Sequence, residues 1–323
     1  MPKITREEVR VPADVMPEAR DEYITNYLKA TRETGRLMLF ACDQKIEHLN
    51  KDFYGEGIDI ADLDPEHLFK IGSEGVCGVL AGQRGLVAQY AADYPEINYL
   101  IKMNSKTNLV GTKQEDPYSP QLYDLDAVLA MKEAGVNIVG LGYTIYLGSE
   151  YEATMMAEAG ELIAQAHANG LIVVLWIYPR GKAVTAEKDP DLIAGAAGVA
   201  LCLGADFVKV NPPKPEDGRT PAEALKVAST AAGRTGLVCA GGSTVDAETF
   251  LTQLYDQIHV GGADGNATGR NIHQRSPWPT SSLASELVGG FAPRASANLA
   301  FDPVGGDLGR PFLSRGIVPL AEG

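Results

Sequence analysis

The chain alternates short apolar runs with longer segments in which apolar residues recur at helical spacing. The apolar runs are rich in branched and aliphatic side chains and are bounded by glycine or polar residues, which is typical of strands buried on both faces. They cover residues 37–42, 75–80, 98–104, 137–141, 171–176, 206–211, 236–240 and, less distinctly, 262–269. The segments between them predict amphipathic helices. The clearest of these cover residues 124–134, 151–169, 191–203, 221–232 and 246–258.

This order of strands and helices predicts an α/β fold with a parallel sheet covered by helices. Eight such units favour a closed (β/α)8 TIM barrel, and a doubly wound open sheet is the alternative. We predict that the barrel covers residues 37–275 and follows a helical extension in residues 1–36 with a helix at 18–34. A C-terminal extension rich in proline and glycine, residues 276–323, is expected to pack on the barrel or on a neighbouring subunit.

Composition and charge narrow the class of protein. Of the 323 residues, 45% are hydrophobic and 22% charged, as in ordinary globular proteins. The net charge of −14 argues against a general nucleic-acid binder, because no basic stripe is available to replace counterions. We find no run apolar enough to span a bilayer and no apolar core of a signal peptide at the N-terminus. The four cysteines form no close pair, so we expect reduced thiols and a cytoplasmic protein.

The candidate chemistry centres on Lys209, which lies within the apolar run 206–211. Burying an ammonium group costs free energy, so a lysine there requires a partner or a purpose. Val208 and Val210 share one face of the strand, and Lys209 occupies the other. If the valines face the helices, Lys209 points into the barrel. Desolvation would lower its pKa and leave a neutral amine, which is the nucleophile of imine-forming enzymes.

The same alternation places other polar residues at the carboxyl ends of the strands, where barrel enzymes have their active sites. When the apolar positions are turned outward, Asp43, Lys102 and Tyr178 point into the lumen with Lys209, and so does Trp176. The sequence therefore predicts one cavity lined by these five side chains.

Glycine-rich segments follow the seventh and eighth predicted strands. Backbone N–H groups of Gly241, Gly242 and Ser243, together with Gly269 and Arg270, could converge on an anion. A pair of glycines is often only a turn, but this place in a barrel favours a phosphate site.

Several of these residues also have simpler interpretations. Asp43 could be a turn residue or cap, and Lys102 could be an ion-pair partner of Asp43. Lys45, Glu47 and His48 could be substrate contacts or part of a solvated loop, and we favour the loop. His67, His167 and His259 lie in helix-like runs and are expected at the surface or at helix caps, and their wide spacing predicts no metal site.

The segment 176–181 reads Trp-Ile-Tyr-Pro-Arg-Gly and precedes the strand with Lys209. Together with Ala-Gly-Gly-Ser at 240–243 and Gly-Arg-Asn-Ile at 269–272, it resembles the archaeal-type class I fructose-bisphosphate aldolases. The resemblance spans roughly residues 35–275. It implies an imine on Lys209, proton transfer by Tyr178 and a phosphate held by the glycine-rich segments. It also implies Asp43 beside the reacting carbon and Trp176 as a wall of the site.

Further expectations come from the same resemblance. The substrate would be a phosphorylated sugar, and the resemblance points first to fructose 1,6-bisphosphate. This sugar would be cleaved reversibly to dihydroxyacetone phosphate and glyceraldehyde 3-phosphate. No metal or other cofactor is needed, because the protonated imine on Lys209 accepts the electrons. The protein would be a homo-oligomer of a size that the sequence does not give. Arg180, Lys182, Lys214 and Arg219 are all available for the distal phosphate.

The chain departs from the family pattern after the first strand. Where many relatives have Asp-His-Gly, this chain has Asp43, Gln44 and Lys45, and extra residues follow near 51–60. Asn211 and two prolines follow the strand lysine in place of a Tyr-Thr ending. These differences leave open a transaldolase- or transketolase-like enzyme acting on another phosphorylated sugar. A catalytically silent phosphate-binding barrel is the remaining alternative.

Overall fold

The computed structural model describes residues 3–48, 50–110 and 115–275. Within these residues, eight parallel strands pair in sequence order, and β8 pairs with β1 to close a barrel. The predicted (β/α)8 fold is confirmed. The strands are β1 (Leu37–Ala41), β2 (Val79–Gln83), β3 (Tyr99–Lys102), β4 (Ile138–Leu147), β5 (Ile172–Pro179), β6 (Phe207–Val210), β7 (Gly236–Ala240) and β8 (Gly265–Thr268).

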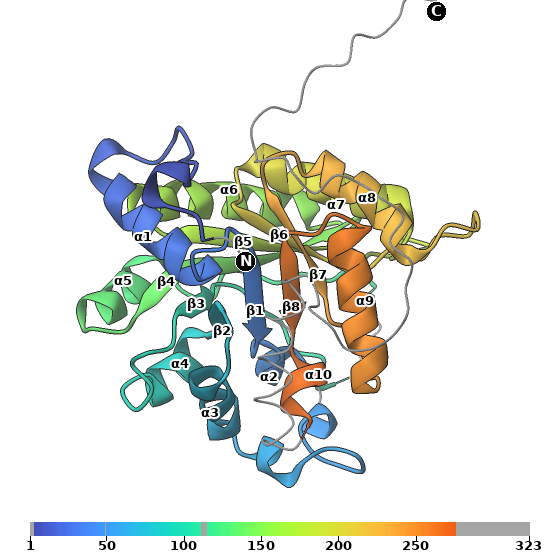
Figure 1. Ribbon diagram of the computed structural model, residues 1–323, viewed down its shortest axis with the longest axis horizontal. Coiled ribbons are helices and arrows are strands. Elements are labelled where there is room, and N and C mark those ends of the chain that lie inside the picture. The colour runs from blue at the N-terminus through green and yellow to red at the C-terminus, as the bar shows by residue number, and fades with distance from the viewer. Residues whose placement is uncertain (1–2, 49, 111–114, 276–323) are drawn as a thin grey trace, which may run out of the picture. The chain divides into compact units, whose positions relative to one another are not determined.

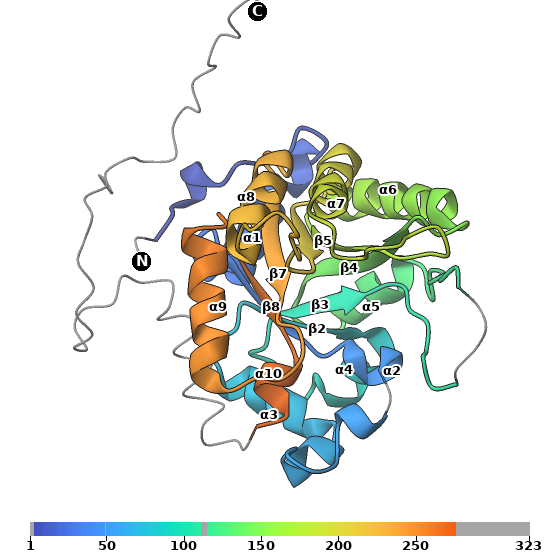
Figure 2. The same ribbon diagram turned by 90° about the vertical axis from the view of Figure 1, so that its right-hand side faces the viewer.

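Helices connect the strands and cover the outside of the barrel (Figure 1). They are α2 (Gln44–Glu47), α3 (Glu66–Glu74), α4 (Arg84–Tyr90), α5 (Asp126–Glu133), α6 (Glu152–Ala168), α7 (Pro190–Leu203), α8 (Pro221–Ala231), α9 (Ala247–His259) and α10 (Arg270–His273). Short 3-10 helices η3 (Asn50–Asp52) and η4 (Ile60–Leu63) lie between α2 and α3. Helices α6, α7 and α8 lie side by side in both ribbon views (Figure 2).

Local sequence signals explain where the helices begin and end. The side chain of Thr220 caps α8 and forms a capping box with Glu223. Asp189 caps α7, which begins with a proline and ends at Gly204 with a left-handed φ of 92°. None of the helices among the described residues is long and apolar enough to cross a membrane.

Among the predicted strands, the second and the fourth differ most from the structure in their bounds. The second begins at Val79 rather than at residue 75, because Gly75 ends α3 and Gly78 passes close to α1. A Cβ at Gly78 would lie 1.9 Å from the carbonyl oxygen of Ala30, so this segment is a close approach rather than part of the sheet. The fourth strand continues to Leu147, because its ladder with β5 extends that far.

The side chains of the barrel separate into two apolar layers, as the alternation predicted. Phe40 and Val208 belong to the outer layer, which packs against the helices. Ala41, Trp176 and Phe207 belong to the inner layer, which fills the lumen. The assumption that apolar residues of one parity face outward is therefore confirmed.

The N-terminal residues form η1 (Arg6–Glu8), η2 (Pro17–Ala19) and α1 (Arg20–Thr31). Asn26 of α1 donates to the carbonyl oxygen of Gly170 at 2.8 Å, and Lys29 donates to Asn137 at 3.0 Å. Both partners precede strands, so α1 lies at the amino ends of the barrel strands. The division into extension, barrel and tail stays a prediction, and the C-terminal extension lies outside the described residues.

Candidate active site

Lys209 lies on β6 with its side chain turned into the lumen. It pairs in register with Trp176 of β5 and Val238 of β7, and only 4% of its surface is exposed. Burial lowers the pKa of Lys209. The carboxylates of Asp43 and Glu47 oppose this shift, whereas Lys102 and Arg270 reinforce it. A lysine with a lowered pKa has more of its amine in the neutral, nucleophilic form at a given pH.

The indole ring of Trp176 stands beside two lysines. The Nζ atoms of Lys209 and Lys102 each lie 5.3 Å from its ring centroid. Gly142 of β4 makes room for the ring, because a Cβ there would lie 2.5 Å from a ring carbon. The indole Nε1 is buried and has no hydrogen-bond partner among the described residues.

Lys102 is fully buried on β3 and pairs with Glu47 of α2. The Lys102 Nζ lies 3.3 Å from Glu47 Oε1 and donates to the carbonyl oxygen of Asn104 at 3.1 Å. Ser105 donates to the same Glu47 oxygen at 3.2 Å. The interpretation of Lys102 as an ion-pair partner of Asp43 is wrong, as is the assignment of Glu47 to a solvated loop. Glu47 follows Asp43 by one turn of α2, but no local pattern indicated that it would reach β3.

Tyr178 lies at the end of β5 and packs against both apolar layers. Burial raises the pKa of its phenol, and the charges of Asp43 and Glu47 raise it further. The phenol therefore keeps its proton and can donate it. The guanidinium of Arg180 lies 6.0 Å from the Tyr178 ring centroid and 5.8 Å from that of Tyr146.

Asp43 follows β1, and only 2% of its surface is exposed. It stands at the N-cap of α2, but its side chain makes no capping hydrogen bond, so the interpretation as a cap is wrong. Its Oδ1 is buried and has no partner among the described residues. The Asp43 charge raises the pKa of both Lys209 and Tyr178, so its carboxylate lies near both groups.

The ends of β7 and β8 are tied together by Asn271. Its Nδ2 donates to the carbonyl oxygens of Gly241 and Ser243 at 2.8 and 3.0 Å, and its Oδ1 accepts from the Val245 N–H. The Gly241 N–H donates to Ala267 at 3.0 Å, so it is not available to an anion.

Arg270 follows the end of β8 and begins α10. Its charge lowers the pKa of Lys209, and its Nε is buried without a partner among the described residues. A terminal nitrogen of its guanidinium lies 3.9 Å from a carboxylate oxygen of Asp52. Gly242, with a left-handed φ of 71°, Ser243 and Gly269 lie on the two adjoining segments.

Two histidines expected at the surface or at caps are buried. His67 and His167 have exposed fractions of 3% and 0% because each is held by polar groups of distant segments. Among the residues that the structure describes, no three His, Cys, Asp or Glu side chains are grouped so as to hold a metal ion.

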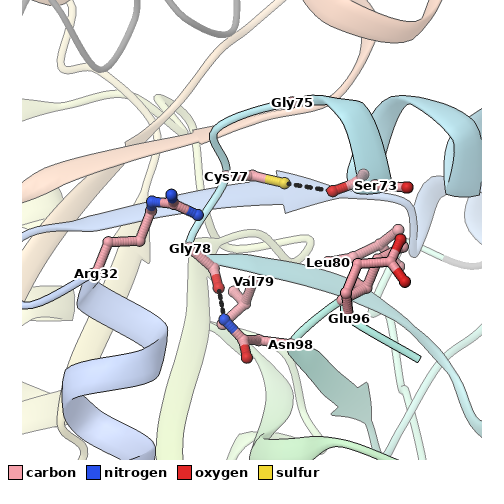
Figure 3. Close-up of a pocket in the computed structure, with 11 residues that line it drawn as sticks. Arg32, Ser73, Gly75, Cys77, Gly78, Val79, Leu80, Glu96 and Asn98 are labelled. Atoms are coloured by element: carbon pink, nitrogen blue, oxygen red, sulfur yellow. Dashed lines mark hydrogen bonds between the residues drawn. The ribbon is translucent and has the colours of Figure 1, made fainter. Parts of the chain in front are cut away.

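A separate cavity of about 220 Å³ lies at the amino end of β2 (Figure 3). Its lining includes Arg32, Cys77, Glu96 and Asn98, and Asn98 donates to the Gly78 carbonyl at 2.9 Å. None of the predicted site residues lines it. The candidate active site lies at the opposite side of the barrel, where Asp43, Tyr178 and Arg270 stand at or just after the carboxyl ends of their strands.

A (β/α)8 barrel with a buried lumen lysine of lowered pKa, next to Trp176, is typical of imine-forming barrel enzymes. Residues 37–275 match the model of the DeoC/LacD family of aldolases, and the chain belongs to that family. The enzyme is therefore an aldolase, a lyase of carbon–carbon bonds, as the resemblance implied.

Proteins similar to this chain are also named aldolases. A protein of Methanocaldococcus jannaschii named fructose-bisphosphate aldolase/6-deoxy-5-ketofructose 1-phosphate synthase is 56% identical over 84% of this chain and 87% of its own length. The solved fructose-bisphosphate aldolase from Slackia heliotrinireducens is 68% identical, with a TM-score of 0.84, over 93% of this chain and 99% of that one. A solved archaeal fructose-1,6-bisphosphate aldolase, with its catalytic lysine covalently bound to the carbinolamine intermediate of the substrate, is 27% identical. Its TM-score is 0.70, over 82% of this chain and 98% of that one.

Proposed function

We propose that this protein is a class I aldolase that reversibly cleaves fructose 1,6-bisphosphate to dihydroxyacetone phosphate and glyceraldehyde 3-phosphate. One observation carries the proposal: Lys209 is buried in the lumen next to Trp176, and its pKa is lowered by burial. The names of the relatives supply the substrate. No metal or other cofactor is required, because the imine itself accepts the electrons.

The proposed cleavage passes through covalent intermediates on Lys209. The neutral Lys209 amine adds to the ketone carbon of the sugar, and the carbinolamine loses water to form a protonated imine. The Asp43 carboxylate takes the proton of the C4 hydroxyl as the C3–C4 bond breaks. The bond electrons pass into the imine to form an enamine, and the aldehyde leaves. Protonation of the enamine and addition of water then release dihydroxyacetone phosphate and restore the Lys209 amine.

Tyr178 and Asp43 move and hold the protons of these steps. Tyr178 keeps its proton because burial and nearby carboxylates raise its pKa, so it donates that proton to the enamine carbon and regains one from Asp43. The unpaired Oδ1 of Asp43 accepts a hydrogen bond from a substrate hydroxyl. Trp176 is a wall of the site, and Lys102 binds substrate from β3.

The phosphate nearest the imine is proposed to lie at the ends of β7 and β8. Gly242, Ser243, Gly269 and Arg270 would hold it, and the unpaired Nε of Arg270 supports this placement. Gly241 would contribute only the close approach of the two strand ends, since a Cβ there would lie 2.8 Å from Thr268 Oγ1.

The distal phosphate is proposed to lie near Arg180 and Lys106. Arg180 stands over the Tyr178 ring, and burial lowers the pKa of Lys106, as does the charge of Arg180. Arg180 pairs with Glu187 at 2.9 Å, as Lys182 pairs with Asp116 and Arg219 with Asp217, so ion pairing does not separate these candidates. Arg180 is preferred because its guanidinium lies over the Tyr178 ring.

Borohydride trapping tests the mechanism. With fructose 1,6-bisphosphate or dihydroxyacetone phosphate, reduction should leave a stable adduct on Lys209, located by mass spectrometry of the peptides. Lys209→Met should abolish both the adduct and cleavage, whereas Lys102→Met should keep the adduct on Lys209. A folded wild-type protein that gives no adduct at Lys209 with either substrate contradicts the proposal and favours the silent phosphate-binding barrel.

A second activity is supported by the double name of the Methanocaldococcus relative and by the departure at Gln44 and Lys45. The enamine on Lys209 could attack an aldehyde other than the one just released, which is transaldolase-like exchange. Disconnecting 6-deoxy-5-ketofructose 1-phosphate between C3 and C4 gives dihydroxyacetone phosphate and a three-carbon 2-oxoaldehyde. Incubation with fructose 1,6-bisphosphate and that aldehyde should yield this product. Its absence would restrict the enzyme to simple cleavage.

The cytoplasmic location, the homo-oligomer and the lack of nucleic-acid binding stay predictions. Light scattering of the purified protein measures the oligomer size directly.

A further inference from the structure

The side chains of Asp62, His273 and Gln44 form a connected row of contacts beside the candidate active site. His273 Nδ1 donates to Asp62 Oδ2 at 2.7 Å, and His273 Nε2 lies 3.2 Å from Gln44 Oε1. The exposed fractions of Asp62 and His273 are 1% and 0%. Buried polar groups with specific partners favour one arrangement of the segments that carry them.

The three side chains come from separate segments. Gln44 begins α2 after β1, Asp62 lies in η4, and His273 ends α10 after β8. The arrowheads of β1 and β8 lead to α2 and α10 in Figure 1. His273 also stacks on Phe53 with ring centroids 5.1 Å apart. The extra segment that the sequence showed after the first strand is therefore packed against the end of the eighth.

The Gln44 end of this row touches the proposed phosphate site. A Cβ at Gly269 would lie 2.6 Å from Gln44 Oε1 and 2.7 Å from its Nε2, so the amide packs directly on the Gly269 backbone. Gly269 and Arg270 are the proposed phosphate donors from β8, and Asp43 immediately precedes Gln44. The orientation of one amide thus affects both the phosphate donors and Asp43.

We propose that His273 is a positioning residue for the aldolase reaction: it fixes the Gln44 amide against Gly269 and so sets the spacing of the phosphate donors. The proposal rests on the function proposed above. His273 itself does not face the reacting atoms, because its two ring nitrogens are occupied by Asp62 and Gln44. Its loss should therefore weaken phosphate binding more than it slows the chemical step.

The substitution His273→Asn isolates the contact with Gln44. An Asn amide nitrogen occupies the place of Nδ1 and can still donate to Asp62, but nothing replaces Nε2. Loss of one such contact should raise the KM for fructose 1,6-bisphosphate by about 5- to 10-fold, with kcat within about twofold of the wild type. The dissociation constant of inorganic phosphate, measured by calorimetry, should rise by a similar factor.

His67→Asn is the matched control. His67 is also buried, and its Nε2 donates to the His273 carbonyl oxygen at 3.0 Å, so this contact is with the backbone rather than with Gln44. This variant should lose stability and keep both the KM and the phosphate dissociation constant. If His67→Asn raises these constants as much as His273→Asn does, the role of His273 is structural and the proposal is overturned.

A double-mutant cycle provides the second readout. Gln44→Ala and His273→Asn should each weaken phosphate binding, and the double variant should be no weaker than Gln44→Ala alone. Additive effects, or unchanged phosphate binding in His273→Asn, would overturn the proposal. Since calorimetry with inorganic phosphate needs no turnover, these outcomes are distinct from a failure of the wild-type enzyme to cleave the sugar.

Discussion

At the scale of single residues, the charges around Lys209 act on its pKa in opposite directions. Burial lowers the pKa most, the carboxylates of Asp43 and Glu47 raise it, and Lys102 lowers it. Lys102 and Glu47 pair with each other at 3.3 Å, so each also moderates the effect of its partner on Lys209. The fraction of neutral amine at a given pH depends on this balance.

Changing either member of the pair should move the reactivity of Lys209 in a known direction. In Lys102→Met the loss of a positive charge raises the pKa of Lys209, so the rise of imine formation with pH moves to higher pH. In Glu47→Gln the loss of a negative charge lowers that pKa, and the rise moves to lower pH. The rate of borohydride trapping with dihydroxyacetone phosphate, measured across pH, checks both. Shifts of the same sign in the two variants would contradict this electrostatic account.

At the scale of elements, the barrel strands carry glycine where a neighbouring side chain needs the space. Gly142 on β4 is such a position, since a Cβ there would lie 2.5 Å from the Trp176 ring and 2.8 Å from Leu100. Gly198 on α7 is different, because nothing lies within 4 Å of the place its Cβ would take. The same residue type therefore serves packing in one element and not in the other.

Gly142→Ala should destabilise the protein by about 2–3 kcal/mol, because the lumen must expand or Trp176 must move. It should also reduce cleavage activity, since Trp176 stands beside Lys209. Gly198→Ala should instead stabilise the protein by about 0.5–1 kcal/mol, because alanine favours the helix. Denaturant unfolding and the cleavage assay measure both variants. Equal effects at the two glycines would argue against the packing of Trp176 described above.

At the scale of the whole barrel, one buried histidine joins the N-terminal segment to the amino ends of the strands. His167 Nδ1 donates to Asp14 at 2.8 Å, and its Nε2 donates to Asp206 at 3.2 Å. Asp206 also accepts from the Tyr23 hydroxyl of α1 and from the Val173 N–H of β5. Burial by itself would lower the pKa of His167, but the hydrogen bonds and charges of Asp206 and Asp14 raise it to about 9.

This raised pKa predicts how stability depends on pH. The folded state holds the proton more tightly than the unfolded chain, whose histidine has its ordinary pKa. The resulting stabilisation is complete below about pH 6.5 and is lost as the pH rises through about 9. Asp14→Asn should lower the free energy of unfolding by about 1 kcal/mol at pH 7 and weaken its decline between pH 7 and 9.

Chemical denaturation at a series of pH values tests the predicted decline of stability as His167 loses its proton. Asp21→Asn is a suitable control, because Asp21 belongs to the same N-terminal segment but pairs with Arg6 at the surface, with 97% of its side chain exposed. The control should keep the wild-type pH dependence. A wild-type protein whose stability does not fall between pH 7 and 9.5 relative to Asp14→Asn would contradict the assignment.

Much of this molecule follows from local patterns. The alternation of apolar and polar positions predicted the barrel and the inner and outer faces of its strands, and it placed Asp43 on the same side as Lys209 and Tyr178, whose pKa values the Asp43 charge raises. Periods of two and of 3.6 residues are local properties, and burial of both strand faces makes them visible in one sequence. Glycines after several helices marked their ends for the same reason, as at Gly204.

Other features depend on which distant segments meet when the barrel closes. No local pattern pairs Glu47 with Lys102, joins Asp62 to Gln44 through His273, or buries His167 between Asp14 and Asp206. The sequence by itself determined the fold and the side chains that face the lumen, because the alternation of residues within each strand shows which of them lie on each of its two faces. Only the tertiary structure decided the partners of those side chains, because contacts between residues far apart in the chain are fixed by strand register and loop packing.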